Sequence, residues 1–476
     1  MLCKMGRHPD RTGHIHMIIS ATGHLPVTTH LFVAGSQYLD SDAVFGMKES
    51  LVAQFERHLP GVGPYGERMD TPFYTVNYDF RLTPAAAAAS AQGGSMRLST
   101  DRILITHVGS LPRSHAVTKV LFARERGDSV DARADAAVIS DAVAQVVRQQ
   151  VALGIDVVSD GEMSKISYAT YIAQRFSGFG GDTPREPGQD LVEFPGLLTK
   201  LAERGSTAKY RRPRCIGPVT VEHTEPLLTD LQNMLSAVKA APAAEAFMNA
   251  ASPGVIALFQ PNDYYPTQDD YLIALAEALR TNYAAIVESG IVLQIDAPDL
   301  AMGRHTMYRN RSMEEFEQLA ARHIEVLNHA LKNVPADRVR MHVCWGNYEG
   351  PHHHDVPMQR LLQIVLKAKP QALLFEAANP RHAHEWAVFR DQHIPDDKIL
   401  IPGVLATTTN YIEHPLLVAE RIERFADIVG RERVMAGTDC GFGTFAGFGP
   451  VEPDIAYLKL AALVEGARLA SKKLWG

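Results

Sequence analysis

Short apolar runs alternate with long stretches of helical periodicity through most of the chain after residue 100. Most of these runs end in polar or catalytic-looking residues, which is typical of β/α units on a parallel sheet. Eight such units in about 380 residues predict an α/β fold, a TIM (β/α)8 barrel over 100–476, with Gly178 to Asp230 as its main insertion. The eight expected strands are ILITHVGS at 103–110, IDVVSDGE at 155–162, PGVIALFQ at 253–260, IVLQIDAP at 291–298, RVRMHVCW at 338–345, ALLFEAAN at 372–379, ILIPGVLA at 399–406 and RVMAGTDC at 433–440.

The first 83 residues follow a different pattern. The runs HIHMIIS, TTHLFVAG and FYTVNYDFRL alternate in the manner of strands and are separated by Gly, Pro and Asp. An alanine, glycine and serine tract, PAAAAASAQGGS at 84–95, follows without an apolar face. We therefore expect a small all-β fragment at 1–83, a linker at 84–99 and the barrel at 100–476, with Met96 as a candidate native start of the barrel.

Composition narrows the functional classes. The chain is 46% apolar and 21% charged, as in ordinary globular proteins, and its net charge of -7 provides no basic field for nucleic acid. It contains no run of about eighteen apolar residues and no signal-peptide pattern, which predicts a cytoplasmic protein without a membrane partner. The four cysteines are too widely spaced for a disulfide scaffold.

Four residues at the ends of the expected strands form a candidate metal site. His342 and Cys344 are one residue apart and so share a face, while Glu376 ends the next strand and Cys440 the last. Two thiolates, an imidazole and a carboxylate suit zinc better than magnesium or calcium. The sequence thus predicts one Zn²⁺ that converts a small substrate's thiol into a nucleophilic thiolate.

Each member of this set also has an ordinary structural interpretation. A His-x-Cys in a strand often serves packing alone, because buried cysteine behaves as a small hydrophobe. Glu376 has a nearby alternative partner in Arg381. The triple His352, His353 and His354 is interpreted as a polar loop, of which one member could reach the pocket.

The motifs THVGSLPRS, DGEM, QIDAP, HVCWGN, LLFEAAN, PGV and TDCG, in this order, resemble the catalytic barrel of cobalamin-independent methionine synthase. The resemblance extends to its short relatives, including epoxyalkane:coenzyme M transferase, and covers residue 100 to the C-terminus. It implies zinc on His342, Cys344, Glu376 and Cys440. It also implies that Ser110, Glu162 and Asp296 hold the thiol substrate, with Glu162 and Asp296 in the catalytic centre.

One departure from the family concerns the proton donor. The family segment after PGV carries a histidine that protonates the leaving group, whereas Thr408 stands there in this chain, and threonine is too weak an acid for that task. An epoxide is the alternative electrophile, for which His305, His354 or Tyr264 would supply the proton. A sulfonated thiol would need a cation, with Arg113 and Arg304 as candidates. The thiol, the alkyl donor and the oligomeric state stay open.

The first ninety residues resemble the C-terminal part of an intradiol dioxygenase of the hydroxyquinol or catechol type. The resemblance rests on GRHPDRTGHIHMIISATGH, TTHLFVAG and YLDSDAVFGMKESL. It implies that His14 and His16 match two ligands of a ferric iron, with Arg11 near the substrate. The family's tyrosine ligands precede this segment, and Tyr38, Tyr74 and Tyr78 are not at matching positions. The alternative function is therefore intradiol ring cleavage by a non-haem iron in this segment, which we expect to be inactive because the segment is truncated. We expect a vestigial site that binds Fe³⁺ only if another chain completes it, or a segment that mediates oligomerisation.

Overall fold

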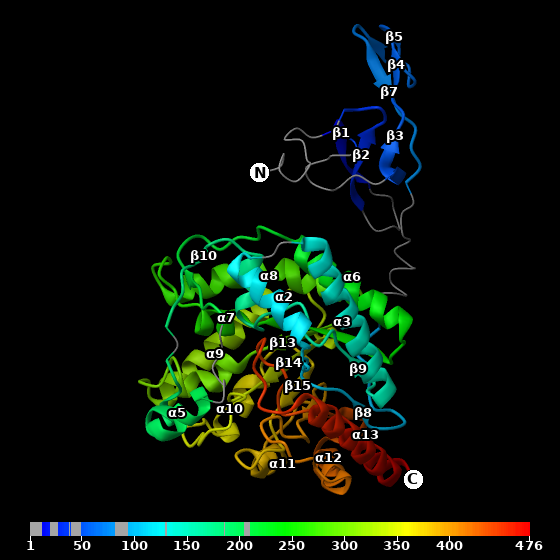
Figure 1. Cartoon of the computed structure of the whole chain (residues 1–476). Helices are drawn as coiled ribbons and strands as arrows, with labels where there is room; N and C mark the ends of the chain where they lie inside the picture. Colours follow the sequence, from blue (N-terminus) through cyan, green and yellow to red (C-terminus); the bar gives the residue numbers. More distant parts are fainter. Residues whose placement is uncertain are drawn as a thin grey trace. The chain divides into compact units, whose positions relative to one another are not determined.

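The computed structural model describes residues 12–19, 27–37, 39, 49–80, 94–128, 131–184, 186–203 and 210–476. Contacts divide the chain into two compact units, Met1–Gly93 and Gly94–Gly476, and each is described here by itself (Figure 1). Residues 84–93 of the expected linker lie outside the described residues.

The second unit is a parallel α/β barrel, as the sequence predicts. Six strands form one sheet in the order β16-β15-β14-β13-β12-β9, and β17 pairs with β8 in a second sheet. Parallel bridges from Leu400 to Val434 and from Gly403 to Gly437 connect β16 to β17, and the backbone N–H of Asp156 bonds Ile105 O at 3.0 Å where β8 meets β9. The eight strands are β8 (Leu104–Ile105), β9 (Val157–Val158), β12 (Glu245–Ala251), β13 (Val292–Asp296), β14 (Val339–Val343), β15 (Ala372–Phe375), β16 (Ile399–Pro402) and β17 (Met435–Ala436).

Helices follow the strands and surround the sheet (Figure 1). Their starts carry the expected local signals, for example the capping box of Ser312 and Glu315 on α9. The helices are α2 (His115–Arg126), α3 (Ala132–Leu153), α6 (Glu225–Ala240), α7 (Pro253–Phe259), α8 (Gln268–Glu288), α9 (Met313–Ala330), α10 (Met358–Val365), α11 (Trp386–Asp391), α12 (Pro415–Val429) and α13 (Pro453–Trp475). Short 3-10 helices are η4 (Thr170–Gln174), η5 (Pro298–Leu300), η6 (Met302–His305), η7 (Ala336–Arg338), η8 (Ala383–Glu385) and η9 (Arg431–Arg433). The insertion holds β10 (Phe179–Gly180), α4 (Gln189–Val192), α5 (Pro195–Glu203) and β11 (Arg214–Cys215).

One expected strand is wrong. Residues 253–260 begin with helix α7, and the strand of that unit is the preceding β12. Ser252 caps the helix through a bond from Val255 N to its Oγ, and Pro253 occupies the first turn, both of which are helix-start signals. Because α7 is buried over nearly its whole surface, its sequence lacks an amphipathic period and is apolar like a buried strand.

Residues 94–99, which we assigned to the linker, pack on the barrel. Met96 is only 4% exposed and joins the interior cluster that contains the first residues of several strands, Leu104, Val157 and Val292 among them. Its backbone N–H bonds Asp337 O at 2.8 Å, and Ser99 Oγ bonds Val434 O at 2.6 Å. This segment therefore closes the amino-terminal end of the barrel interior.

The described part of the first unit consists of strands and one short 3-10 helix, η3 (Glu49–Leu51). β1 (His14–Ile19) pairs antiparallel with β2 (Val27–Val33), which pairs with β3 (Val52–Ala53). Two smaller pairs are β4 (Glu56–His58) with β7 (Phe73–Thr75) and β5 (Gly61–Val62) with β6 (Arg68–Met69). None of the described helices in either unit has the length and apolar character that crossing a membrane requires.

Candidate metal and active site

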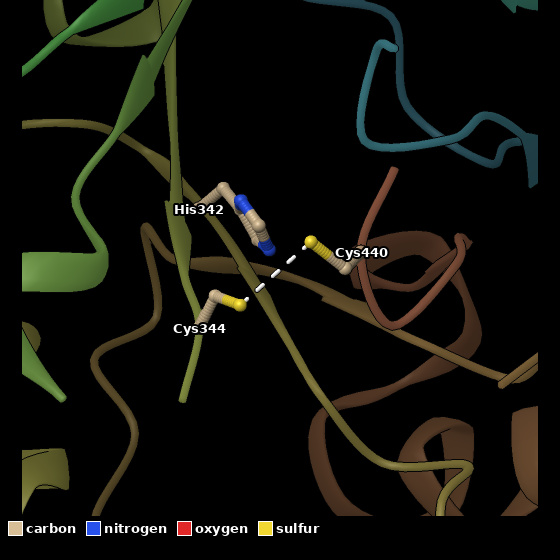
Figure 2. A group of neighbouring side chains, drawn as sticks. All are labelled: His342, Cys344 and Cys440. Carbon is tan, nitrogen blue, oxygen red and sulfur yellow. Dashed lines mark hydrogen bonds between the residues drawn. The ribbon is translucent and has the colours of Figure 1, made fainter. Parts of the chain in front are cut away.

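Two thiols and an imidazole meet at the carboxyl end of the barrel (Figure 2). His342 lies in β14, Cys344 directly follows that strand, and Cys440 lies in the segment after β17. Their ligand atoms all lie within 4.8 Å of one another, and the two Sγ atoms are 3.7 Å apart. Tetrahedral zinc with bonds of about 2.3 Å to sulfur holds two thiolates about 3.8 Å apart, so the donor set fits zinc.

Further polar groups orient His342. Its Nδ1 lies 3.5 Å from Asp296 Oδ1 and its Nε2 lies 3.3 Å from Asp439 O. Asp296 in turn accepts bonds of 2.8 Å from Asn249 and from Gln294. A carboxylate on the second ring nitrogen is the usual support of a metal-binding histidine.

Glu376 does not join this group. Its Oε1 accepts the backbone N–H of Trp345 at 2.9 Å, and its Oε2 accepts bonds from Asn379 at 2.6 Å and Arg381 at 2.7 Å. Burial alone would raise the pKa of Glu376, but Arg381 lowers it below its usual range. The geometry thus favours the alternative partner, Arg381, and the fourth ligand predicted from the sequence is not placed with the other three.

A cavity of about 200 Å³ opens beside the two thiols. Its apolar wall consists mainly of aromatic rings, with Tyr168 lying against both Phe259 and Phe445 at centroid distances of 5.5 and 5.8 Å. Its polar side carries carboxyl, hydroxyl and amide groups. The lining residues are Val108, Ser110, Glu162, Tyr168, Phe259, Asp296, Pro298, Met302, His342, Cys344, Gly346, Asn347, Tyr348, Cys440, Gly441, Thr444, Phe445 and Phe448.

The structure brings Ser110, Glu162 and Asp296 to this cavity, as the resemblance implies. Ser110 approaches Gly441 so closely that a Cβ there would lie 1.9 Å from the serine Oγ. Glu162 has a left-handed backbone, with φ of 57°, and its Oε2 has no hydrogen-bond partner among the described residues. Burial raises the pKa of Glu162 to about 7.

Arg113 does not line the cavity. Its Nε and one terminal nitrogen donate to Glu162 O at 3.1 and 2.9 Å, and its other terminal nitrogen donates to Gly443 O. The guanidinium is therefore committed to backbone carbonyls and serves the loop that carries Glu162. Arg304 also lies outside the cavity lining and donates to Arg309 O at 3.2 Å.

The proton donors considered from the sequence lie elsewhere. His305 is 1% exposed and lies beside Asp355, with Nδ1 3.2 Å from Oδ1. His354 bonds Glu193 at the surface, and Tyr264 is 50% exposed. Neither they nor Thr408 line the cavity.

The described N-terminal residues do not assemble a metal group. His14 Nδ1 lies 2.8 Å from Thr12 O, and its ring lies against His30 and Phe32. His16 is placed only by its strand register opposite His30. Tyr74 is 61% exposed, and Tyr78 donates to Ser50 O. Arg11 and Tyr38 lie outside the described residues. The groups of three or more candidate ligands found among described residues all belong to the barrel.

Sequence reasoning missed the supporting residues. The Asp439 carboxylate accepts the backbone N–H groups of Ala377, Ala378 and Asn379 at 2.8 to 2.9 Å, which joins the loop after β15 to the segment that bears Cys440. Its place in the TDCG motif, next to Cys440, was the available signal. Asn347 donates to Gly441 O at 2.8 Å, and nothing in the sequence indicated that contact.

Fold and site define a TIM-type α/β barrel with two buried thiols and an imidazole at the carboxyl end of its strands. The family "Cobalamin-independent synthase, Catalytic domain" matches residues 103–186 and 254–452, and the chain belongs to this family.

The chain is 26% identical to the methionine synthase of Saccharolobus solfataricus over 375 residues, which are 78% of this chain and 95% of that protein. It is 25% identical to the methionine synthase of Sulfurisphaera tokodaii over 370 residues, 78% of this chain and 93% of that protein. The solved structure of a B12-independent methionine synthase from Shewanella sp. W3-18-1 shares the fold, with a TM-score of 0.59 and 17% identity over 78% of this chain and 99% of that one. The resemblance stated from the motifs and the predicted barrel are thereby confirmed.

The N-terminal segment has a separate similarity, also as predicted. The family "Dioxygenase" matches residues 1–84. The chain is 44% identical to the hydroxyquinol 1,2-dioxygenase of Nocardioides simplex over 86 residues, which are 18% of this chain and only 29% of that enzyme. This match establishes a resemblance to part of a dioxygenase.

Proposed function

We propose that the barrel is a zinc-dependent transferase that alkylates a small amino thiol of the homocysteine type. The observation that carries the proposal is the convergence of His342, Cys344 and Cys440 on the wall of a cavity that also presents two carboxyl groups. When bound, zinc supplies the Lewis acidity that lets a substrate thiol ionise near neutral pH. Membership of the family and the similarity to methionine synthases support transfer of a methyl group.

The residues around the cavity divide the remaining work. Asp296, held by Asn249 and Gln294, keeps the His342 ring oriented. Ionised Glu162 and Asp296 attract a substrate ammonium group, because opposite charges in a poorly solvated pocket interact strongly. The aromatic wall keeps water from the nucleophile and offers an apolar face to the alkyl donor.

The same lining disfavours coenzyme M as the thiol substrate. A sulfonate needs a cation, but no lysine or arginine is among the described residues that line the cavity. Arg113 is occupied by carbonyl oxygens, and the carboxylates of Glu162 and Asp296 line the cavity. The substrate thiol is therefore one that carries an amine.

The choice of alkyl donor depends on whether the leaving group needs a proton, because Thr408 stands where the family has its proton-donating histidine. A pterin donor leaves as an amine that needs a proton, whereas a sulfonium donor leaves as a neutral thioether and needs none. Both kinds of donor belong in the assay, beside an epoxide.

The test combines a spectroscopic and a chemical measurement on the full-length chain. Protein loaded with Co²⁺ should show the near-ultraviolet charge-transfer band of thiolate bound to cobalt. Homocysteine with a suitable donor should yield its thioether by mass spectrometry, while coenzyme M should not. Cys440→Ser should lose both signals.

Cys215→Ser is the matched control, because Cys215 is another buried barrel cysteine, and its Sγ donates to Gly217 O at 3.4 Å. It should keep both signals. Thioether formation that survives unchanged in both Cys344→Ser and Cys440→Ser contradicts the proposal.

A further inference from the structure

A second group of candidate metal ligands lies at the same end of the barrel, outside the cavity lining. His305 ends η6, His352 and Asp355 belong to the loop after β14, and His382 follows β15. The ligand atoms of His305, His352 and Asp355 lie within 4.8 Å of one another. The side chains of His305 and His352 are 1% and 0% exposed, so this cluster is shielded from water.

The Nδ1 atoms of two histidines face one carboxylate. His305 Nδ1 lies 3.2 Å from Asp355 Oδ1, and His352 Nδ1 lies 3.1 Å from both oxygens of Asp355. Ligands about 2.1 Å from one metal ion are about 3.0 to 3.4 Å apart in octahedral or tetrahedral geometry. These spacings therefore match neighbouring ligands of one ion.

The other ring nitrogens indicate where the protons are. His352 Nε2 lies 3.2 Å from Tyr348 O, a carbonyl that can only accept, so Nε2 carries the hydrogen. Tyr348 donates its hydroxyl hydrogen to Asp190 at 2.7 Å, so His305 Nε2, 3.4 Å from that hydroxyl, is a donor as well. The neutral form of each imidazole then has an unprotonated Nδ1 that points at Asp355.

Two further observations separate this group from a simple hydrogen-bonded cluster. His305 Nδ1 is buried and has no hydrogen-bond partner among the described residues, despite its proximity to Asp355. His352 has a left-handed backbone with φ of 53°, and among described non-glycine residues it shares a positive φ only with Glu162. Such backbone strain persists where surrounding contacts fix it and is concentrated at functional sites.

We propose that His305, His352 and Asp355 form a second metal site, for a divalent first-row transition ion such as Zn²⁺ or Fe²⁺. Two imidazoles and one carboxylate are a donor set that these ions accept. His382 bonds the second Asp355 oxygen at 3.0 Å and Glu385 at 2.7 Å, so it supports the carboxylate as a protonated partner. The ion at this site would not contact the reacting atoms, and the site does not rest on that proposed function.

Its role is to position one wall of the cavity. The ring of Tyr348, which lines the cavity, stacks on His352 at a centroid distance of 4.0 Å. One loop, from Cys344 to Asp355, connects the two sites, because Cys344 belongs to the thiol group and Asp355 to the second group. An ion there would fix Tyr348 at the cavity edge.

Metal analysis of the full-length chain tests the proposal. Protein incubated with Zn²⁺ alone, or anaerobically with Fe²⁺ alone, and then freed of excess ion should contain two equivalents per chain for at least one of these ions. Asp355→Asn should hold one equivalent and keep the cobalt charge-transfer band. The Cys344→Ser/Cys440→Ser protein should hold one equivalent without that band. His384→Ala, an exposed histidine outside the candidate ligand groups, is the control and should hold two.

X-ray absorption on the Cys344→Ser/Cys440→Ser protein observes the second site directly, because all of its proposed ligands are present. This measurement does not depend on whether Asp355→Asn folds. It should show nitrogen and oxygen donors with imidazole scattering and no sulfur. Failure of the double cysteine protein to retain either ion overturns the second site. Absence of the cobalt charge-transfer band from the wild-type protein would instead contradict only the thiol site.

Discussion

Each unit of the chain carries a pair of candidate ligands one residue apart on a strand, His14 and His16 in β1 and His342 and Cys344 at the end of β14. The spacing puts each pair on one face of its strand. In the barrel, closure brings Cys440 from the far end of the chain to the pair. In the described N-terminal hairpin His14 bonds the nearby backbone and its ring lies against His30, and no group of three candidate ligands is found among the described residues there. Two histidines on one strand need further ligands, and in the barrel the topology supplies one.

The largest expected effect comes from removing one ligand of the barrel group. His342→Ala should lower thiol alkylation on the order of 10³-fold, because removing one member of a group that acts as a unit loses most of its effect. The full-length chain is measured with saturating zinc.

His14→Ala is the matched variant and should leave the rate within about twofold, the scatter expected for a site outside the mechanism. Added Fe³⁺ should likewise give no tyrosinate charge-transfer band. An iron-dependent visible band that His14→Ala abolishes would show that the N-terminal pair binds metal after all.

A second prediction concerns the border between the two units. Met96→Ala should lower the free energy of unfolding of the barrel by about 2 to 4 kcal/mol, as for other buried methionines. Leu98, 40% exposed, is the neighbouring control, and Leu98→Ala should change it by about 0.5 kcal/mol or less. Urea unfolding followed by tryptophan fluorescence measures both, since Trp345, Trp386 and Trp475 all belong to the barrel. Equal effects would assign residues 94–99 to a linker.

The smallest predicted effect concerns the pH dependence of kcat/KM through the buried carboxyl group of Glu162 in the barrel. Glu162 is neutral below its pKa of about 7 and charged above it. Because only the charged form attracts an ammonium group, kcat/KM for the amino thiol should fall about tenfold per pH unit below that value and level off above it. Glu162→Gln should lower kcat/KM above pH 7 and remove this dependence. A wild-type profile that is flat between pH 5 and 8 would exclude this role.

The sequence predicted the barrel because most of its strands are apolar runs that end in polar residues. It failed at β12, where EAFMNAA has few β-branched residues, and at α7, where an all-round buried helix has the composition of a strand. It predicted His342, Cys344 and Cys440 as metal ligands from their places at strand ends, and the structure brings their ligand atoms together. Glu376 stays a predicted ligand, and no sequence pattern reveals that Trp345 N–H, Asn379 and Arg381 bond both of its carboxylate oxygens.

His305 stays a predicted proton donor, although it does not line the cavity. Its place depends on how η6 folds back after β13, and nothing local in GRHTMYRN encodes that path. The cluster around Asp355 joins residues from three different loops, so it becomes visible only in three dimensions.

The barrel closes through two sheets instead of one continuous ladder. His342 and Cys344 end a strand of the six-stranded sheet, whereas Cys440 follows β17 of the two-stranded sheet. An ion held by all three would span the border that isolated bridges otherwise secure. The metal ion that activates the thiol would then also link the two sheets, and the metal content of the protein would affect the stability of the barrel.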